Sequence, residues 1–159
     1  MKNQTCCFTG HRTIPEREQD SLSDRLQEII RCLVRSGYRY FGTGGALGFD
    51  TMAAQAVLHL KAEFPHIKLI LVLPCKNQAD KWSEKDRITY ENIKRRADKV
   101  VYISDYYTRE CMLQRNRHLV DCSSFCICYL TRNSGGTAYT VNYAKGKAVP
   151  IVNLAQNTT

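Results

Sequence analysis

The stretch RYFGTGGALGFDTMAAQ, residues 39–55, decides the fold of this chain. The apolar and aromatic run Tyr38–Phe41 predicts a strand, and the glycine loop 42–45 follows it directly. Asp50 then opens a predicted helix over residues 51–64. A strand, a glycine loop and a helix in this order present backbone N–H groups and a helix N-terminus to an anion. The stretch therefore predicts an α/β unit that carries an anion-binding loop.

The same alternation continues on both sides of this unit. Residues 68–73 (KLILVL) form a continuous apolar run, which suits a strand of a parallel sheet covered on both faces. The other expected strands are 5–9, 100–104, 125–130 and 149–154, and the other expected helices are 18–35, the second half of 77–98, 108–122 and 137–145. The pattern predicts a doubly wound, mostly parallel Rossmann-like sheet of about six strands with helices on both faces. No repeat or linker interrupts it, so we expect one domain over residues 1–159.

Three loops that contain glycine or arginine follow expected strands. They are TGHR at 9–12, GTGG at 42–45 and SGG at 134–136. In doubly wound sheets ligands bind beyond the carboxyl ends of the strands, where the strand order reverses. We therefore expect the three loops to converge on one ligand site.

The amino-acid composition indicates which kinds of binding partner to expect. The formal net charge of +8 favours anionic partners, either phosphorylated small molecules or, weakly, nucleic acid. The basic residues are scattered, so a solvated basic surface is the alternative explanation. The polar start Met1–Thr5 and the short apolar run after it exclude a signal peptide or a membrane span there. We expect a cytoplasmic protein that does not enter the membrane.

The 8 cysteines fit a reducing compartment. Most of them fall in or beside expected strands, where free cysteine behaves as a small buried hydrophobe. Cys126 and Cys128 share one strand face, but a metal site needs further ligands in a recognisable spacing. We therefore predict no metal site.

Three segments carry a family resemblance. No loop contains GxGxxG or GxxxxGK[ST], so a standard NAD or ATP site is not expected. The segments GGALGFDTMAA (44–54), RNRHLVDCS (115–123) and SGGTAYTVNYAKGKAVPIV (134–152) occur in this order. They resemble the Rossmann-like core of the SLOG superfamily, which includes the DNA-processing protein DprA and the LOG cytokinin-activating enzymes. CCFTGHR (6–12), with Gln78, Trp82 and RNRHLVD, resembles the small YpsA-like branch, whose function is largely unassigned.

The resemblance implies a pocket for a nucleotide or a nucleotide-derived phosphorylated ligand, and no other cofactor. The family fold also allows homodimers. Carried over residue by residue, it points to Gly10 and Arg12; to Gly44, Gly45, Gly48 and Asp50; to Arg115, Asn116 and Arg117; and to Gly135, Gly136 and Thr137.

One departure concerns catalysis. LOG enzymes carry PGGxGTxxE, and its Glu takes part in splitting the base from the ribose phosphate. Here SGGTAYTVN places Asn142 or Thr140 at that position, depending on the register. Neither residue ionises to stabilise an oxocarbenium-like transition state. Asp50 and Asp121 are the carboxylates that could stand in, and no catalytic residue is assigned.

Alternatives remain open at several positions in the loops. The glycines 44, 45 and 48 either cradle a phosphate, which we favour, or allow a tight turn. Asp50 either holds a ribose hydroxyl or caps its helix. His11 beside Arg12 is either part of an anion clamp that titrates near neutral pH or an exposed loop residue without a role.

The expected helix over residues 108–122 raises a similar choice. Arg115 and Arg117 lie two residues apart and so point in different directions on a helix. We expect Arg115 or Asn116 to face the pocket. Trp82, the only tryptophan, either stacks on a base or anchors its segment to the core.

Three functions follow. The preferred one is a sensor or accessory protein that binds a nucleotide-derived ligand. The first alternative is LOG-like hydrolysis of the N-glycosidic bond of a nucleoside phosphate. The second is DprA-like binding of single-stranded nucleic acid, for which Tyr106, Tyr107 and Arg109 are the nearest grouping of aromatic and basic residues.

Overall fold

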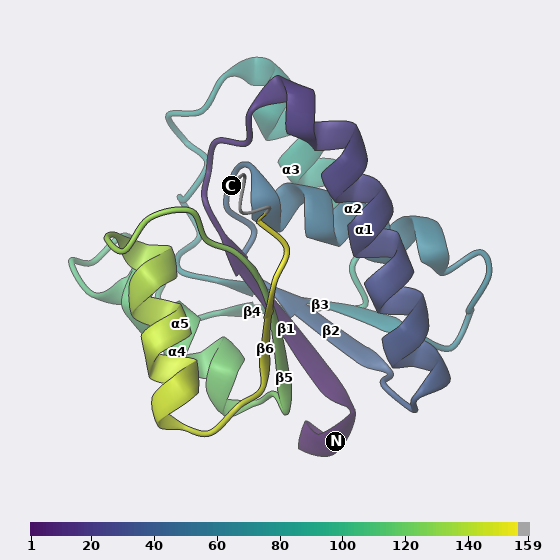
Figure 1. Ribbon diagram of the computed structural model, residues 1–159. Helices are drawn as coiled ribbons and strands as arrows, with labels where there is room; N and C mark the ends of the chain where they lie inside the picture. Colours follow the sequence, from purple (N-terminus) through teal and green to yellow (C-terminus); the bar gives the residue numbers. More distant parts are fainter. Residues whose placement is uncertain (156–159) are drawn as a thin grey trace.

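The computed structural model describes residues 1–155 and shows strands alternating with helices (Figure 1). The strands are β1 (Thr5–Gly10), β2 (Tyr40–Thr43), β3 (Lys68–Leu73), β4 (Lys99–Tyr102), β5 (Phe125–Tyr129) and β6 (Ile151–Asn153). The helices are α1 (Glu16–Arg35), α2 (Phe49–Leu60), α3 (Glu84–Arg96), α4 (Cys111–Asp121) and α5 (Gly136–Gly146), with a 3₁₀ turn at Lys2–Gln4.

The sheet is parallel throughout, in the order β4-β3-β2-β1-β5-β6. Strand β1 lies at its centre, with Cys7 opposite Gly42 on one side and Cys126 on the other. The chain builds outward from β1 to β4 and then crosses back to add β5 and β6. The order therefore reverses between β1 and β5, which is where ligands bind in such sheets. The predicted doubly wound α/β fold is confirmed.

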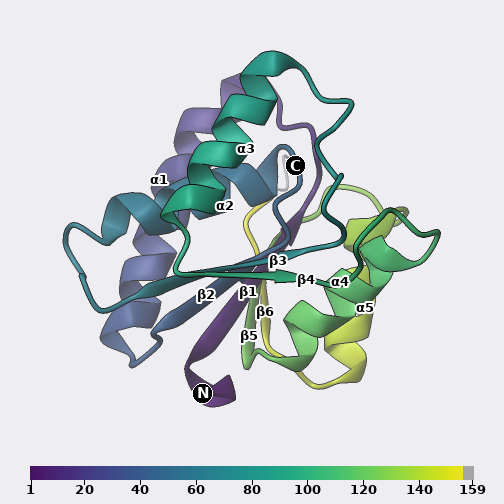
Figure 2. The same cartoon turned by 180° about the vertical axis from the view of Figure 1, so that it is seen from behind.

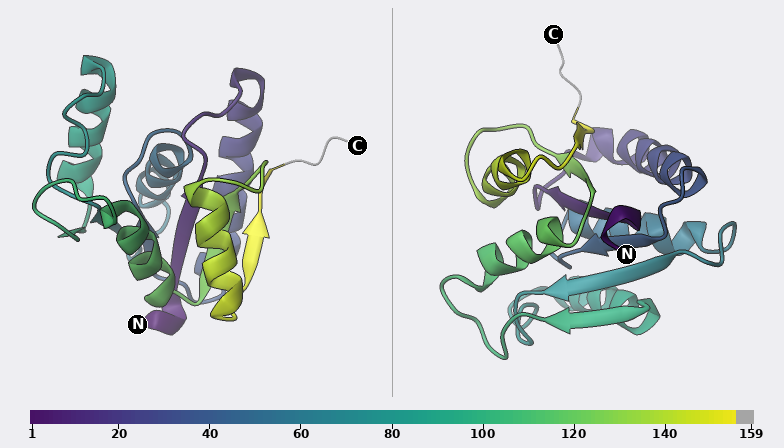
Figure 3. Two further views of the ribbon diagram at one scale, coloured as in Figure 1. Left: turned by 90° about the vertical axis from the view of Figure 1, so that its left-hand side faces the viewer. Right: turned by 90° about the horizontal axis from the view of Figure 1, so that it is seen from below.

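The two faces of the sheet carry different helices. Figures 1 and 2 show α1, α2 and α3 together on one face and α4 and α5 on the other, and Figure 3 shows the twisted sheet between them. This division follows from chain direction, because right-handed crossovers change face when the strand order reverses.

Side chains of β1 point alternately to the two faces of the sheet and contribute to a hydrophobic core on each face. Phe8 is buried on the α1–α2 face with Phe41 and Leu71, whereas Cys7 is buried on the α4–α5 face with Val120. Strand side chains alternate between faces, so a strand covered on both sides is apolar at consecutive positions. The burial of Cys7 as a small hydrophobe agrees with the sequence prediction.

Helix α2 begins earlier than its sequence pattern suggests. Gly48 occupies the N-cap position with φ of 77°, and Phe49 and Asp50 are the first helical residues. Phe49 is fully buried and stacks on Tyr129 of β5 with ring centroids 6.1 Å apart. Burial of this aromatic ring draws the helix start towards β1 and β5, a long-range effect that local periodicity does not reveal.

Candidate functional site

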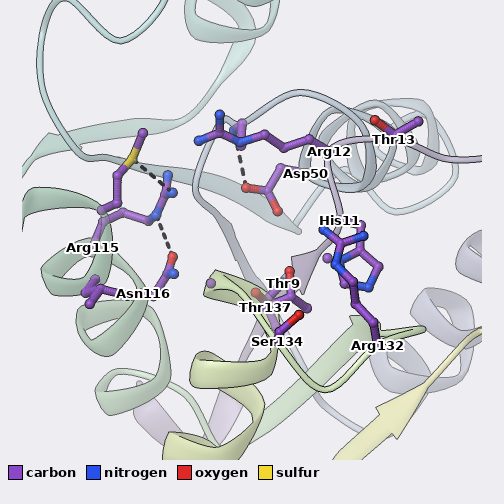
Figure 4. Close-up of a pocket in the computed structure, with 15 residues that line it drawn as sticks. Thr9, His11, Arg12, Thr13, Asp50, Arg115, Asn116, Arg132, Ser134 and Thr137 are labelled. Atoms are coloured by element: carbon purple, nitrogen blue, oxygen red, sulfur yellow. Dashed lines mark hydrogen bonds between the residues drawn. The ribbon is translucent and has the colours of Figure 1, made fainter.

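A pocket of about 300 Å³ opens at the carboxyl end of the sheet, beside the β1–β5 reversal (Figure 4). The ends of β1 and β5 and the first turns of α2, α4 and α5 contribute to it. The predicted residues that line it are Gly10, His11, Arg12, Asp50, Arg115, Asn116, Gly136 and Thr137. Gly44, Gly45, Gly48, Arg117 and Gly135 are not among its lining residues.

His11 ties the first loop to the loop after β5. Its ring Nε2 accepts a hydrogen bond from the Thr131 backbone N–H at 2.9 Å, and the backbone N–H of His11 donates to the Tyr129 carbonyl at 3.3 Å. Burial lowers the pKa of His11, and the charge of Arg132 lowers it further. The residue is only 5% exposed, so the exposed-loop alternative is wrong. The neutral imidazole of His11 accepts a hydrogen bond from the Thr131 N–H and so holds the loop after β5 in place.

Asp50 brings a carboxylate into the pocket from the first turn of α2 (Figure 4). Its Oδ2 accepts from the Ala46 N–H at 3.2 Å, whereas its buried Oδ1 has no hydrogen-bond partner among the described residues. Burial raises the pKa of Asp50 above its ordinary value, and the Arg115 charge acts in the opposite direction. Asp50 does not occupy the N-cap position, because Gly48 does. The alternative in which Asp50 caps the helix is therefore not what the structure shows.

Arg115 and Arg117 project to opposite sides of α4. The Arg115 guanidinium is 4% exposed and donates to the Gly44 carbonyl and, from Nε, to Asn116 Oδ1 at 2.6 Å. Burial lowers the pKa of Arg115, and the Asp50 charge partly opposes that effect. Arg117 instead donates to the Tyr139 hydroxyl of α5 at 2.9 Å. The pocket thus receives Arg115 with Asn116, and Arg117 packs against α5.

The glycines of the second loop permit close packing. A Cβ on Gly48 would lie 2.2 Å from the Arg12 carbonyl oxygen, and a Cβ on Gly44 would lie 2.4 Å from an Arg115 guanidinium nitrogen. Gly45 and Gly48 also have positive φ. These contacts favour the tight-turn alternative over the phosphate cradle, since the backbone space that glycine leaves is already occupied.

The loop after β5 supplies the anion-binding features. Gly136 and Thr137 are the first residues of α5, and no side chain caps this helix N-terminus. Unpaired N–H groups at such a terminus attract anions. Arg132 and Ser134 of the same loop also line the pocket. Sequence reasoning did not select these two residues, although both lie in the TRNSGG loop that it identified.

The remaining catalytic candidates lie elsewhere. Thr140 donates from Oγ1 to the Gly136 carbonyl at 2.8 Å, within α5. Asp121 accepts from the Tyr143 hydroxyl at 2.7 Å on the exposed side of α4 and α5. Neither of them, nor Asn142, lines the pocket, and Asp50 is the only carboxylate among its lining residues. Of the two proposed stand-in carboxylates, only Asp50 lines the pocket.

A metal-binding cluster and a membrane-spanning helix are both absent from residues 1–155. This part of the chain contains no group of three or more His, Cys, Asp or Glu side chains placed to hold a metal ion. None of its helices is both long enough and apolar enough to span a bilayer.

Comparison with known proteins identifies the family. The sequence pattern described as the YspA SLOG family (YpsA) matches residues 9–152. The uncharacterized SPbeta prophage-derived protein YoqJ of Bacillus subtilis is 31% identical in an alignment of 137 residues that covers 78% of this chain and 80% of that protein. A UPF0398 protein of Brevibacillus brevis is 34% identical in an alignment of 125 residues that covers 77% of this chain and 66% of that protein.

The fold has a close structural counterpart. DNA processing protein A of Helicobacter pylori, described in connection with its single-stranded DNA binding mode, superimposes with a TM-score of 0.70 at 17% identity. The alignment covers 99% of this chain and 68% of that one. Sequence pattern, relatives and fold agree with the resemblance drawn from the sequence. The chain belongs to the YpsA family of the SLOG superfamily.

Proposed function

We propose that this protein binds a nucleotide or nucleotide-derived phosphorylated ligand in the β1–β5 pocket and acts as a sensor or accessory protein. One observation carries the proposal. A single pocket combines the uncapped N-terminus of α5 with a buried Asp50 carboxylate oxygen that has no partner among the described residues. The first feature suits a phosphate, and the second suits a hydroxyl donor such as that of a ribose.

The pocket charges support this division. Arg132 and the α5 N–H groups lie at one part of the pocket and favour an anion. The buried Arg115 donates to Gly44 and Asn116, and its charge offsets that of Asp50. The phosphate therefore binds at the α5 end and the sugar at the Asp50 end.

A thermal-shift screen of nucleoside mono-, di- and cyclic phosphates and ADP-ribose tests the proposal. A ligand present at a hundredfold excess over its Kd stabilises the folded state by about 2.7 kcal/mol. Arg132→Ala should abolish most of the shift. Arg96→Ala on α3, which removes the same charge outside the pocket, should retain it. The absence of a shift with every phosphorylated compound at millimolar concentration would contradict the proposal.

Hydrolysis of an N-glycosidic bond is the second candidate. It is favoured by one observation, the unpartnered oxygen of Asp50, the only carboxylate among the residues that line the pocket. An ionised carboxylate at this position could stabilise positive charge that develops on the ribose. Release of free base from a nucleoside monophosphate, lost in Asp50→Asn, would move this candidate ahead of simple binding.

A further inference from the structure

A second pocket of about 370 Å³ adjoins the first. Tyr107 from the loop after β4 and Met112 of α4 line it, together with five residues of the segment after β3: Asn77, Gln78, Asp80, Lys81 and Trp82. Met112 lines both pockets, so the two pockets meet at this side chain.

The second pocket offers aromatic surfaces for a flat ring. Trp82 is half-buried and held edge-on against Tyr90, with ring centroids 5.1 Å apart. Tyr107 is 61% exposed, and Asn77 Oδ1 fixes its backbone by accepting from its N–H at 3.1 Å. A fixed backbone beneath an exposed ring lowers the ordering cost of stacking on a ligand. Aromatic side chains of this kind stack on nucleobases.

Gln78 supplies a directional polar group. Its Nε2 donates to the Gly45 carbonyl at 3.5 Å and approaches the Tyr90 hydroxyl at 3.4 Å. Because a carbonyl oxygen only accepts hydrogen bonds, the amide nitrogen of Gln78 faces Gly45. The amide oxygen Oε1 therefore points the other way and can accept a hydrogen bond. Oε1 is buried and has no hydrogen-bond partner among the described residues. Such an atom is completed by an N–H donor.

We propose that this second pocket binds the base of the ligand, and that the base is an aminopurine whose edge N–H donates to Gln78 Oε1. The aromatic rings accept the face of the purine, and the nearby Asp80 carboxylate adds a further acceptor for its edge. This inference rests on the proposed function, because the phosphate and ribose of the same ligand occupy the first pocket.

Calorimetric titration with four probes tests the inference. They are AMP, GMP, purine riboside 5′-monophosphate, which lacks edge N–H donors, and ribose 5-phosphate, which lacks the base. We expect AMP or GMP to bind most tightly, purine riboside monophosphate about 2- to 12-fold more weakly, and ribose phosphate weakest. Gln78→Leu should remove the preference for the aminopurine over purine riboside.

Two neighbouring tyrosines form a matched pair of variants. Tyr107→Ala should weaken binding of the aminopurine nucleotide about 5- to 150-fold and leave ribose phosphate binding unchanged. Tyr106→Ala, at an exposed position that does not line the pocket, should leave both affinities unchanged. Because both rings are exposed, neither variant is expected to unfold the protein.

The possible results separate the two proposals. Equal affinities for ribose phosphate and the nucleotides, or unchanged nucleotide binding in Tyr107→Ala, would overturn the base pocket and leave the phosphate pocket intact. Failure of all four probes to bind would overturn the base pocket, whereas the proposed function falls only if every compound of the thermal-shift screen also fails.

Discussion

At the scale of single residues, Asp50 has an unusual position. It combines a buried carboxylate, one oxygen without a hydrogen-bond partner within residues 1–155, and the charge of the buried Arg115 nearby. Its pKa is raised from 3.8 despite the Arg115 charge, so burial outweighs attraction. Groups held in such surroundings are frequent at functional sites, where binding is maintained at the expense of stability.

Asp50→Asn should therefore increase the free energy of unfolding at pH 7. A raised folded-state pKa means that the protonated form is favoured by folding, so wild-type stability is lost as pH rises from the ordinary value of 3.8 through the folded pKa. Urea denaturation between pH 4 and pH 8 should show this decline in the wild type and not in the variant. A less stable variant at pH 7 would mean that attraction to Arg115 dominates.

At the scale of elements, the glycine loop and α2 show why these residues are glycines. Gly48 caps α2 with positive φ, and its missing side chain admits the Arg12 backbone. Gly10 of β1 likewise admits the Phe49 ring, since a Cβ there would lie 2.4 Å from Phe49 Cγ. The loop after β2 and the loop after β1 therefore interlock and hold Asp50 at the pocket.

Gly48→Ala should destabilise the protein strongly. The left-handed backbone alone costs about 1–2 kcal/mol for a non-glycine residue, and overlap with the Arg12 backbone adds to this. Gly146→Ala at the end of α5 is the control, because its added Cβ meets nothing within 4 Å. It should change stability by less than about 1 kcal/mol. Similar denaturation midpoints for the two variants would show that the interlocked loops relax freely.

At the scale of the whole molecule, surface charge and the fold relationship raise the question of nucleic acid. The chain carries a net charge of +8, and a DprA described as binding single-stranded DNA has the same fold. Arg115 is buried and donates to the Gly44 carbonyl, so it does not belong to an exposed basic surface. The exposed grouping of Tyr106, Tyr107 and Arg109 remains the nearest counterpart of a stacking surface.

We predict weak, sequence-independent binding of single strands. If six or more phosphates are neutralised, affinity should fall about a thousandfold between roughly 50 and 200 mM salt. Fluorescence anisotropy of a labelled oligonucleotide at both salt concentrations measures this. Submicromolar binding that persists at the higher salt, and is lost in Arg109→Ala, would place nucleic acid ahead of the nucleotide ligand. Homodimer formation and a cytoplasmic location also stay predictions for the whole molecule.

Local sequence signals were enough to predict the secondary-structure elements and the family. Apolar runs, helical periodicity and glycine breaks are local signals, so the six strands, the five helices and the loops at the carboxyl ends were predictable. Helix start positions were less so, because burial of Phe49 against Tyr129 moves the start of α2.

Only the tertiary structure decided what each loop residue does. Spacing showed that Arg115 and Arg117 diverge, but packing of α4 against the sheet and α5 selects Arg115 for the pocket. Within residues 1–155, one side-chain oxygen of Asp50 and one of Gln78 are buried without a hydrogen-bond partner, which depends on how distant segments pack around them. The close contact of Gly48 with the Arg12 backbone likewise joins two segments that are far apart in the sequence. The physical reason is that burial and hydrogen-bond partners depend on which distant segments meet, whereas periodicity reports only on neighbours along the chain.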